Sequence, residues 1–340
     1  MNKRDEPGRI RRIIQAGVGG MGEGWTDRVA DSARWEAAAY VDVSEGALLS
    51  AADRHGMPKT RCYTDLKRCL TEVEADAVLD VTPQKFRKSV CLNAFERGLH
   101  VLSEKPLADS LRNARLLVDA AAQTSRTFMV AQNYRYQALT QTVKHVLNQG
   151  KLGEVGYVGI NFQKGPRFGG FRETMPYPLV LDMAIHHIDM LRCILDSDIA
   201  TVQATSIQAP WNWNQGEATV MAQLETSTGV SANYFGSWVA TGWETGWNAD
   251  WRIEGSKGVL IWEADELYLS NKPGTRKKAA IRKWPVAHQA YLIDLFAEYL
   301  DTGEEPETSG RRNLNSLAST YAIVKAAETG RKVRVSELLK

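Results

Sequence analysis

Short apolar runs alternate with helical stretches in the N-terminal part of the chain. Apolar and β-branched residues predict strands at Arg9–Val18, Trp35–Val43, Ala77–Val81, His100–Leu102 and Phe128–Ala131. Helical patterns lie between them, over Glu45–His55, onward from Asp65, and over Lys88–Arg97 and Leu107–Thr124. Because strands that alternate with helices become parallel strands joined by crossover helices, this part is predicted to be a doubly wound α/β sheet with its ligand at the carboxyl ends of the strands.

The pattern changes in the second half, where short strands follow one another with turn residues between them. They are predicted at Val155–Gln163, Thr201–Ile207, Ala218–Leu224, Val230–Trp238, Trp251–Glu254 and Val259–Trp262. Closing helices are predicted at Ala287–Leu300 and Leu314–Thr329, the latter ending at Gly330 as its C-cap residue. This half therefore reads as a sheet with few helices, and 340 residues suit two domains.

Composition narrows the class of partner. The 42 Lys and Arg residues nearly balance the 40 Asp and Glu residues, which argues against a nucleic acid or an anionic membrane as the main partner. The segment Met1–Arg12 is charged, and no apolar run approaches the roughly 20 residues of a membrane span. The four cysteines form no C-x-x-C pair, so reduced thiols are expected. We expect a soluble cytoplasmic protein that acts on a small molecule.

The first predicted strand runs into a G-x-G-x-x-G motif at Gly17, Val18, Gly19, Gly20, Met21 and Gly22. Gly17 would permit a tight turn, Gly19 would let the backbone approach a pyrophosphate, and Gly22 would allow close packing of the following helix. The second strand ends near Asp42, whose carboxylate suits the adenosine ribose diol and repels a 2′-phosphate. Since Val43 and Ser44 offer no arginine, NAD is favoured over NADP. The alternative is that Asp42 only caps the next turn.

The ends of two later strands place further polar residues at the same edge. Thr82, Pro83 and Gln84 follow one of them, and Glu104, Lys105 and Pro106 follow the next. Proline keeps the preceding residue out of helical geometry, so Lys105 is expected in a fixed, non-helical pose beside the cofactor cleft. A surface lysine before a helix-starting proline is the alternative.

The apolar run Leu181–Leu191 contains three polar groups at helical spacing. Asp182, His186 and Asp189 stand at i, i+4 and i+7, which places them on one helix face. Burial of these groups is costly, so they should pair with one another or face a polar cleft. A structural hydrogen-bonded pair of Asp182 and His186 is an equal alternative from this stretch alone.

Taken together, these motifs resemble those of the Gfo/Idh/MocA oxidoreductases, the group of glucose-fructose oxidoreductase and inositol dehydrogenase. The resemblance rests on the glycine motif, Thr82-Pro83, Glu104-Lys105-Pro106, Asn133-Tyr134-Arg135 and the D-x-x-x-H-x-x-D motif from Asp182 to Asp189, and it runs from about Arg9 to Leu339. It implies a Rossmann domain over residues 9–132 and an α/β domain over 133–340 with a large, open, mostly antiparallel sheet. It also implies a homodimer or homotetramer formed through that sheet.

The resemblance further implies roles for three residues. Lys105, Asp182 and His186 match the family positions that face the nicotinamide, with Asn133 beside the cofactor. Hydride transfer from a secondary alcohol needs a base for the hydroxyl proton, and His186 is the candidate. Asp182 would orient the imidazole, and Lys105 would stabilise the charge that develops on the oxygen. Lys105 as the base is an acceptable exchange.

The substrate is suggested by a loop and by aromatic residues. Arg167, Phe168, Arg172 and Tyr177 lie in the Gly- and Pro-broken loop Gly165–Pro178, which could line the cleft together with Lys105, Asp182 and His186. Aromatic rings pack on sugar faces, so the tryptophans of this half suit a sugar, glycoside or cyclitol. For any one of them, a place in the sheet core or in a subunit contact is the more common role. The set comprises Trp211, Trp213, Trp238, Trp243, Trp247 and Trp251.

Two departures from the family pattern and several alternatives remain. Many members carry a His shortly after Thr-Pro, where this chain has Phe86-Arg87, and a Gly where it has Ala184. His187 directly follows His186, so either ring could face inward, although the spacing from Asp182 favours His186. The alternatives are a keto-sugar or imine reductase, a non-catalytic NAD(P)-sensing regulator, and a metal-dependent hydrolase or lyase. Adjacent histidines point about 100° apart on a helix and chelate poorly, so no metal is expected.

Overall fold

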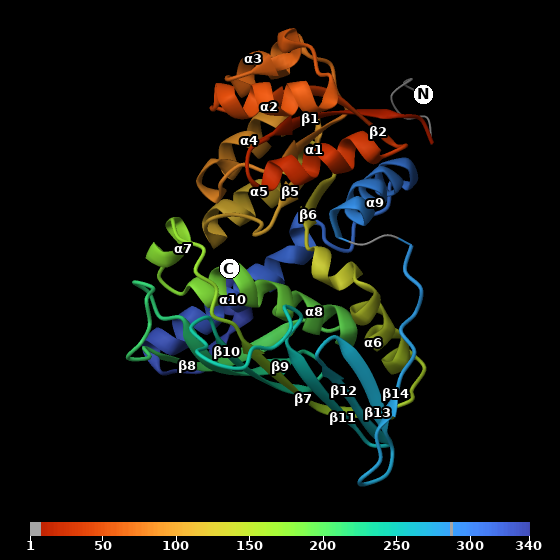
Figure 1. Ribbon diagram of the computed structural model, residues 1–340, viewed down its shortest axis with the longest axis vertical. Coiled ribbons are helices and arrows are strands. Elements are labelled where there is room, and N and C mark those ends of the chain that lie inside the picture. Colours follow the sequence, from red (N-terminus) through yellow and green to blue (C-terminus); the bar gives the residue numbers. More distant parts are fainter. Residues whose placement is uncertain (1–7, 286–287) are drawn as a thin grey trace. The chain divides into compact units, whose positions relative to one another are not determined.

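The computed structural model describes residues 8–285 and 288–340 and contains two compact units (Figure 1). The first unit is formed by described residues within Met1–Asn133 and Pro285–Leu314, and the second by Tyr134–Trp284 and Asn315–Lys340. Each unit carries one sheet. The two-sheet α/β fold expected from the sequence is confirmed.

The first unit has a six-stranded parallel sheet in the order β3-β2-β1-β4-β5-β6. The order reverses at β1, which is the doubly wound arrangement whose ligand crevice lies outside the carboxyl ends of the strands. Nearly all residues of β1, β4 and β6 are buried, as expected for parallel strands that are covered by helices on both faces. They are β1 (Arg11–Ala16), β2 (Trp35–Val41), β3 (Cys62–Tyr63), β4 (Ala77–Asp80), β5 (His100–Glu104) and β6 (Phe128–Ala131).

Side-chain caps explain where several helices of this unit begin. Ser44, Asp65 and Ser110 each accept a hydrogen bond from a backbone N–H in the first turn of the helix that follows. Ser110 starts its helix four residues later than the sequence pattern predicts, and the helix predicted from Lys88 begins at Gln84, after Pro83. The helices are α1 (Met21–Asp31), α2 (Glu45–His55), η2 (Lys59–Arg61), α3 (Leu66–Glu72), α4 (Gln84–Glu96) and α5 (Leu111–Gln123).

A late segment of the chain returns to the first unit. Helix α9 (His288–Thr302) stacks Phe296 on Trp35 with 5.4 Å between the ring centroids, and the Trp35 indole N–H donates to the Ile293 carbonyl at 2.7 Å. Arg11 pairs with Asp301 at 2.7 Å. Sequence analysis assigns this segment to the second domain, because local pattern does not reveal such long-range contacts. Its predicted start, Ala287, lies outside the described residues.

The second unit has a nine-stranded sheet in the order β14-β13-β12-β11-β7-β10-β9-β8-β15. Neighbouring strands are antiparallel, except that β7 and β10 run parallel to each other. The carboxyl ends of β7 and β10, which are distant in the chain, therefore lie side by side. The order includes three strands that sequence analysis missed, β13, β14 and β15. The strands are β7 (Val155–Gln163), β8 (Ile199–Ile207), β9 (Thr219–Thr226), β10 (Ser231–Ser237), β11 (Asp250–Gly255), β12 (Gly258–Glu263), β13 (Glu266–Ser270), β14 (Lys277–Lys278) and β15 (Val333–Arg334).

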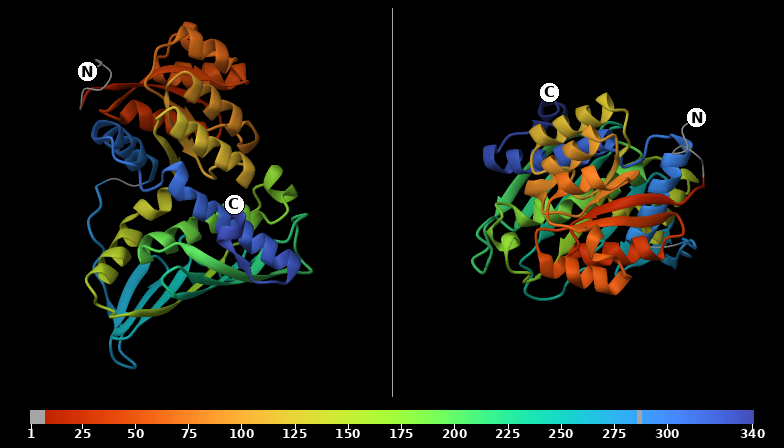
Figure 2. Two further views of the ribbon diagram at one scale, coloured as in Figure 1. Left: turned by 180° about the vertical axis from the view of Figure 1, so that it is seen from behind. Right: turned by 90° about the horizontal axis from the view of Figure 1, so that it is seen from above.

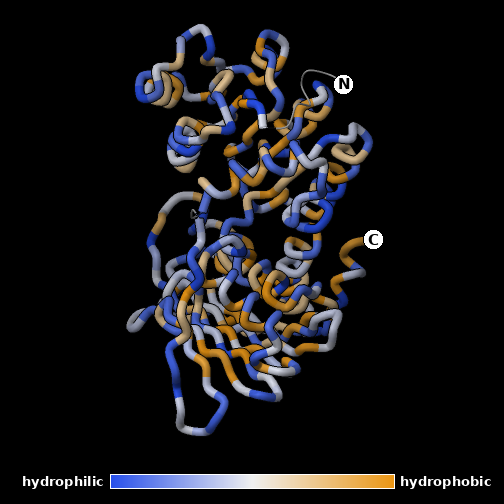
Figure 3. The backbone as a smooth tube through the Cα atoms, turned by 90° about the vertical axis from the view of Figure 1, so that its right-hand side faces the viewer, coloured by the Kyte–Doolittle hydropathy of each residue, from blue (hydrophilic) through white to orange (hydrophobic). Residues whose placement is uncertain are grey.

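Helices of this unit lie on one face of its sheet, as Figures 1 and 2 show for α6 and α8, and the tube in Figure 3 shows hydrophobic residues concentrated along the strands. Side chains alternate accordingly, for example along β10, where Ala232 and Tyr234 are buried while Asn233 and Phe235 are exposed. The opposite face carries no helix among the described residues of the unit. The helices are η3 (Asn133–Tyr136), α6 (Ala138–Asn148), α7 (Phe171–Thr174), η4 (Leu179–Ala184), α8 (Ile185–Leu195), α10 (Gly310–Thr329) and α11 (Val335–Leu338).

Candidate active site

The glycine motif forms the turn between β1 and α1, and two of its glycines are required by the protein itself. A Cβ on Gly17, which has φ +87°, would stand 2.8 Å from the Val81 carbonyl group, and one on Gly22 would stand 2.3 Å from the Gly17 oxygen. A Cβ on Gly19 or Gly20 meets nothing closer than 3.4 Å. The space beside these two is therefore open on the side where α1 begins, as an approaching pyrophosphate requires.

The buried amide of Gln15 holds this turn from below. Its Nε2 donates to the carbonyls of Gly17 and Gly22, at 3.0 and 2.8 Å. The N-cap residue of α1 is Gly20, which provides no capping side chain, so the first turn of the helix is left accessible to an anion.

Asp42 lies at the end of β2, beside the glycine turn. One carboxylate oxygen accepts the Val18 N–H and the other the Ser44 N–H, both at 2.9 Å. The capping role considered from the sequence is thus present. It does not exclude the ribose role, because each carboxylate oxygen has a second lone pair for a hydroxyl donor. Val43 beside it is 84% exposed and carries no charge.

The Glu104-Lys105-Pro106 motif lies at the end of β5. Glu104 is held by the Trp25 indole, whose Nε1 donates to Oε1 at 2.8 Å, and its Oε2 accepts the Lys105 N–H at 3.0 Å. The bond between Lys105 and Pro106 is cis, as the sequence allowed. Lys105 is half-buried and lies outside any helix, and its place beside the cofactor cleft stays a prediction.

All residues predicted to bind the cofactor belong to the first unit and follow the carboxyl ends of its strands. The glycine motif follows β1, Asp42 follows β2, Thr82 to Gln84 follow β4, Glu104 and Lys105 end β5, and Asn133 follows β6. Because the strands are parallel, these ends share one edge of the sheet. The topology thus brings this predicted set together.

In the second unit, the helix that carries the D-x-x-x-H-x-x-D motif changes type inside the motif. Residues Leu179–Ala184 form a π-helix, and α8 continues from Ile185. Asp182 lies in the π segment and is buried, and its Oδ2 accepts a hydrogen bond from Arg172 Nε at 2.7 Å. π segments are rare and frequent at functional sites. The role of Asp182 in orienting His186 stays a prediction.

The two adjacent histidines have different surroundings. His186 is buried and stacks on Tyr134, with 4.2 Å between ring centroids and 23° between planes. His187 turns to the sheet, where its Nε2 lies 3.0 Å from the Trp247 carbonyl and its Nδ1 lies 3.1 Å from the Tyr234 hydroxyl. A carbonyl only accepts, so Nε2 carries the proton and Nδ1 accepts from Tyr234. His187 is thus a structural residue, which leaves His186 as the candidate base.

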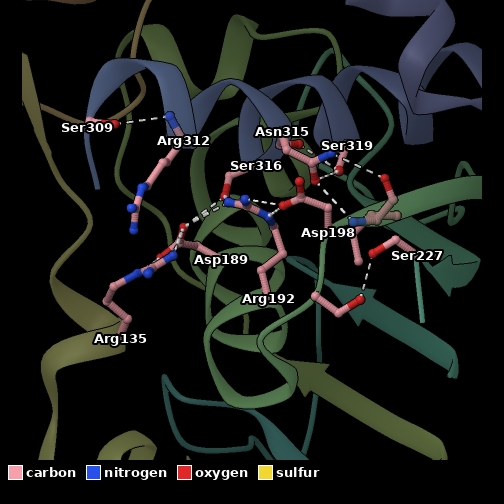
Figure 4. Close-up of polar contacts among 12 residues, drawn as sticks. Arg135, Asp189, Arg192, Asp198, Ser227, Ser309, Arg312, Asn315, Ser316 and Ser319 are labelled. Carbon is pink, nitrogen blue, oxygen red and sulfur yellow. Dashed lines mark hydrogen bonds and ion pairs between the residues drawn. The ribbon is translucent and has the colours of Figure 1, made fainter. Parts of the chain in front are cut away.

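Asp189, the third polar residue of the D-x-x-x-H-x-x-D motif, has a structural role (Figure 4). Its carboxylate receives both Arg135 Nε and Nη2, at 2.7 and 2.8 Å, and the Ser316 hydroxyl at 2.8 Å. Arg192 donates to the same Ser316 at 2.7 Å. Burial alone would raise the pKa of Asp189, but Arg135 outweighs it and holds that pKa below the ordinary value. The network ties η3, α8 and α10 together.

The loop upstream of the π segment is rich in cation–aromatic contacts. The Arg172 guanidinium carbon lies 5.1 and 4.9 Å from the ring centroids of Phe168 and Phe171. Arg167 lies 4.1 Å above Trp213. Phe168 also contacts Trp238 and Trp247, at 5.9 and 6.3 Å. This loop therefore presents aromatic faces and guanidinium groups beside Asp182.

The tryptophans divide into three groups. Trp251 is fully buried and stacks on Trp262 at 6.1 Å, so it belongs to the sheet core. Trp238 is buried and Trp213 half-buried beside the loop, whereas Trp243, Trp211 and Trp247 are 94, 57 and 40% exposed. Of the six tryptophans, Trp251 and Trp238 are buried as a place in the core requires, and a place in a subunit contact stays a prediction for the others. Tyr177, also predicted at the substrate, is half-buried and has φ +126°, and burial raises its pKa, with Glu217 and Glu328 adding to the effect.

Comparison with known proteins places this geometry in a family. Residues 11–132 match the family model described as an oxidoreductase family with an NAD-binding Rossmann fold, and residues 140–261 match the model of the Gfo/Idh/MocA C-terminal domain. The two matches span well over half of the chain. The protein belongs to the Gfo/Idh/MocA oxidoreductase family.

Several relatives align with this oxidoreductase over most of its length. An uncharacterised protein of Sinorhizobium fredii is 26% identical, covering 96% of each chain. The D-apiose dehydrogenase of Paraburkholderia graminis is 28% identical, covering 89% of this chain and 84% of its own. A crystal structure of an Agrobacterium radiobacter oxidoreductase with NAD+, L-tartaric acid and magnesium has a TM-score of 0.88 at 22% identity, covering 96% of this chain and 99% of that one.

Some residues of this Gfo/Idh/MocA oxidoreductase were missed by sequence reasoning. Tyr134 and Arg135 were noted only as part of a motif, although one stacks on His186 and the other binds Asp189. Gln15 and Trp25 gave no signal, since an amide inside a strand and a tryptophan inside a helix are ordinary. Arg172 was noted in its loop, but its pairing with Asp182 was not predictable. The available clue to this pair was that the positively charged Arg172 stands ten residues before the carboxylate of Asp182.

Two further observations concern metals and membranes. Within the described ranges, no group of three or more His, Cys, Asp and Glu side chains is arranged to hold a metal ion. No helix in the same part of the oxidoreductase combines the length and apolar character needed to cross a membrane.

Stability of the oxidoreductase should depend on pH through His187. Burial lowers the pKa of His187 from 6.5 to about 4, although the Trp247 carbonyl acts in the opposite direction. Between pH 4 and 6.5 the unfolded chain therefore binds a proton at His187 that the folded chain does not bind. The free energy of unfolding is unaffected by titration of His187 above pH 6.5 and decreases as the pH falls toward 4. In that window His187 adds a slope of about 1.4 kcal/mol per pH unit to the free energy of unfolding.

Urea unfolding of wild type and a His187→Gln variant at several pH values between 4 and 7 measures this slope. We expect a steeper slope in wild type than in the variant, whatever their absolute stabilities. Equal slopes would show that His187 does not titrate between the two states.

Proposed function

We propose that the protein is an NAD-dependent dehydrogenase that transfers a hydride between a secondary alcohol of a sugar, glycoside or cyclitol and the nicotinamide. One observation carries the proposal: Lys105 is fixed at the same sheet edge as the glycine turn and Asp42. The family membership supports hydride chemistry, and the named relative acting on D-apiose supports a sugar. His186, at the buried end of a helix in the second unit, supplies the matching base.

The bound dinucleotide would accept the hydride from the carbinol carbon. His186 would take the hydroxyl proton as the hydride leaves for the dinucleotide, so the alcohol would become a ketone or lactone and one proton would remain on the protein. The Lys105 ammonium donates to the same oxygen and stabilises its developing negative charge. Asp182 orients the His186 ring. In the reverse direction the same groups return the proton to a keto-sugar.

Asp42 supports NAD over NADP. Its carboxylate is already fixed by two backbone N–H groups, and a free lone pair on each oxygen suits the 2′- and 3′-hydroxyls of the adenosine ribose. A 2′-phosphate would meet a negative charge with no arginine at Val43 or Ser44 to balance it.

Arg167, Tyr177, Asp182 and His186, with Lys105 from the first unit, are the proposed substrate contacts. The exposed aromatic faces of Phe168 and Trp247 suit the apolar face of a sugar ring. The guanidinium groups of the loop would donate hydrogen bonds to the hydroxyl groups of the sugar. The positions of these donors would then determine which sugar binds.

The experiment that tests the function is absorbance at 340 nm with purified protein, NAD or NADP, and a panel of inositols, aldoses and glycosides. Reduction of NAD by at least one compound, faster than reduction of NADP, is the expected result. If NAD binds but no compound in the panel or the matching keto-sugars reacts, the protein is a cofactor-binding regulator instead.

We also propose that the face of the nine-stranded sheet without helices binds a second copy of the chain. Met221 and Phe235 are 49 and 40% exposed there and line a hollow of about 820 Å³, and Tyr157 on β7 is 55% exposed. Exposed large apolar side chains on one sheet face suit a subunit contact. Light scattering should therefore give the mass of a dimer or tetramer, and Phe235→Glu should lower it. Phe171→Glu, at a phenylalanine that begins α7 and is 59% exposed, is the control. If light scattering gives the mass of a monomer for the wild-type protein, the proposal is contradicted.

A further inference from the structure

We propose that Arg87 is a positioning residue for Lys105, because its buried guanidinium group holds the far side of the turn that carries this lysine. The inference rests on the proposed function of Lys105. The pair Phe86-Arg87 stands where many members of the family carry a histidine, so the role belongs to this chain's own sequence. Every contact in the argument lies within the first unit.

Arg87 reaches from α4 to the end of β5. It is almost completely buried, and its Nη1 donates to the carbonyl of Pro106, the residue directly after Lys105. Its Nη2 donates to the Thr82 carbonyl at 3.3 Å, and its Nε donates to Asp80 at 3.1 Å. One guanidinium group thus joins the ends of β4 and β5. A buried carbonyl needs such a donor, because leaving it unpaired is costly.

Asp80 is the hub that keeps this guanidinium group in place. It is fully buried at the end of β4 and accepts hydrogen bonds from the Thr82 N–H at 3.0 Å, the Thr82 hydroxyl at 2.6 Å and the Ser103 hydroxyl at 3.0 Å. Ser103 precedes the Glu104-Lys105-Pro106 motif by one residue. A buried carboxylate with these donors needs a cation beside it, and Arg87 is that cation.

The near side of the turn is held independently. Glu104 accepts the Lys105 N–H, and Trp25 of α1 holds Glu104 in turn. Lys105 therefore lies between two anchors, one from α1 and one from α4. Catalysis depends on placing the ammonium group within hydrogen-bond reach of the reacting oxygen, and displacement by about 1 Å costs on the order of 100-fold in rate. Removing the Arg87 anchor leaves Lys105 present but misplaced.

The kinetic test compares Arg87→Met, Arg87→Lys and a matched control, Arg97→Met. Arg97 follows the last residue of the same helix, and its side chain donates to Thr71 at the surface, at 3.0 Å. We expect Arg87→Met to lower kcat by about 10- to 100-fold, with a much smaller change in the Kd for NAD, since the glycine turn and Asp42 hold the other end of the dinucleotide. Arg87→Lys should retain part of the rate because it keeps the charge beside Asp80. Arg97→Met should match wild type.

A second readout does not depend on turnover. Lysines labelled by reductive ¹³C-methylation give one NMR signal each, and the Lys105 signal is assigned by its loss in Lys105→Arg. We expect it to move in Arg87→Met toward the position of exposed lysines, and to respond less to added NAD. The other lysine signals should stay unchanged. A general loss of stability would instead move many signals together.

Each outcome decides the question. A kcat within threefold of wild type together with an unchanged Lys105 signal would overturn the proposal. Loss of NAD affinity at unchanged kcat would also overturn it, since Arg87 would then serve the cofactor alone. If Arg87→Met does not fold, Arg87→Lys is judged by the same criteria. If wild type oxidises no compound, the proposed function fails, while the Lys105 signal still reports whether Arg87 positions the lysine.

Discussion

Replacing Lys105 with methionine is expected to lower kcat/KM by about 10²- to 10³-fold, because the variant loses the only ammonium group at the proposed oxygen position while keeping its apolar stem. His186→Ala should lose a similar or larger factor, since general base catalysis contributes about 10²- to 10⁴-fold. Both variants should bind NAD with nearly the wild-type Kd. Steady-state rates at 340 nm and calorimetric titration of NAD measure the two quantities.

Lys151→Met is the matched control, because this exposed lysine precedes the second sheet and is distant in sequence from every predicted site residue. It should retain full activity. Activity of Lys105→Met or His186→Ala within about tenfold of wild type would remove that residue from the catalytic set. Loss in both variants cannot assign the base by itself. The pH dependence of kcat/KM in the two single variants assigns it, because only loss of the base removes the limb of the profile that reports proton removal.

Replacing Arg135 with methionine is expected to destabilise the protein by about 3–5 kcal/mol, the usual cost of leaving one member of a buried ion pair unpaired. Asp189 would then be fully buried without its main cation, with the Ser316 hydroxyl and the more distant Arg192 as its remaining partners, so its burial would become costly. Urea unfolding followed by circular dichroism measures the loss. Because Tyr134 adjoins Arg135 and stacks on His186, activity should fall as well.

Two variants separate this ion pair from a general effect of removing arginine. Arg28→Met removes an exposed arginine that is paired with Asp31 in α1, and should cost less than about 1 kcal/mol. In the double variant Arg135→Met with Asp189→Leu, neither member of the buried pair is left without the other, so much of the stability should return. Equal losses in Arg135→Met and Arg28→Met would contradict the assignment of the buried pair as a main support of α8.

The features that were predicted correctly from the sequence are those with a local physical cause. Gly17 and Gly22 were predicted from a six-residue motif, and their crowding against Val81 and the Gly17 carbonyl explains why no other residue fits. The alternation of strands and helices predicted the parallel sheet, and topology then brought Asp42 and Lys105 to one edge. The preference for His186 over His187 followed from spacing alone, and the partners of His187 support it.

The remaining features depend on contacts between distant segments, which local pattern does not encode. Asp189 was predicted on the same helix face as His186, but its partner Arg135 lies 54 residues earlier in the chain. The return of α9 to the first unit depends on Trp35 and Phe296, which are far apart in the chain. The change of helix type before Ile185 was also missed, because a π segment and an α-helix share the same apolar pattern at this length.

That π segment has a consequence for how such sites diverge. A π turn closes its hydrogen bond one residue later than an α turn, so Leu179–Ala184 holds one residue more than a regular helix would. Deleting a single codon there would restore regular helix without turning the residues on either side, because the segment takes up its extra residue locally. Asp182, which lies inside the segment, would change its position relative to His186, while α8 and its buried network stayed in place. The spacing between carboxylate and imidazole is therefore open to one-step genetic change, whereas the position of the imidazole is not.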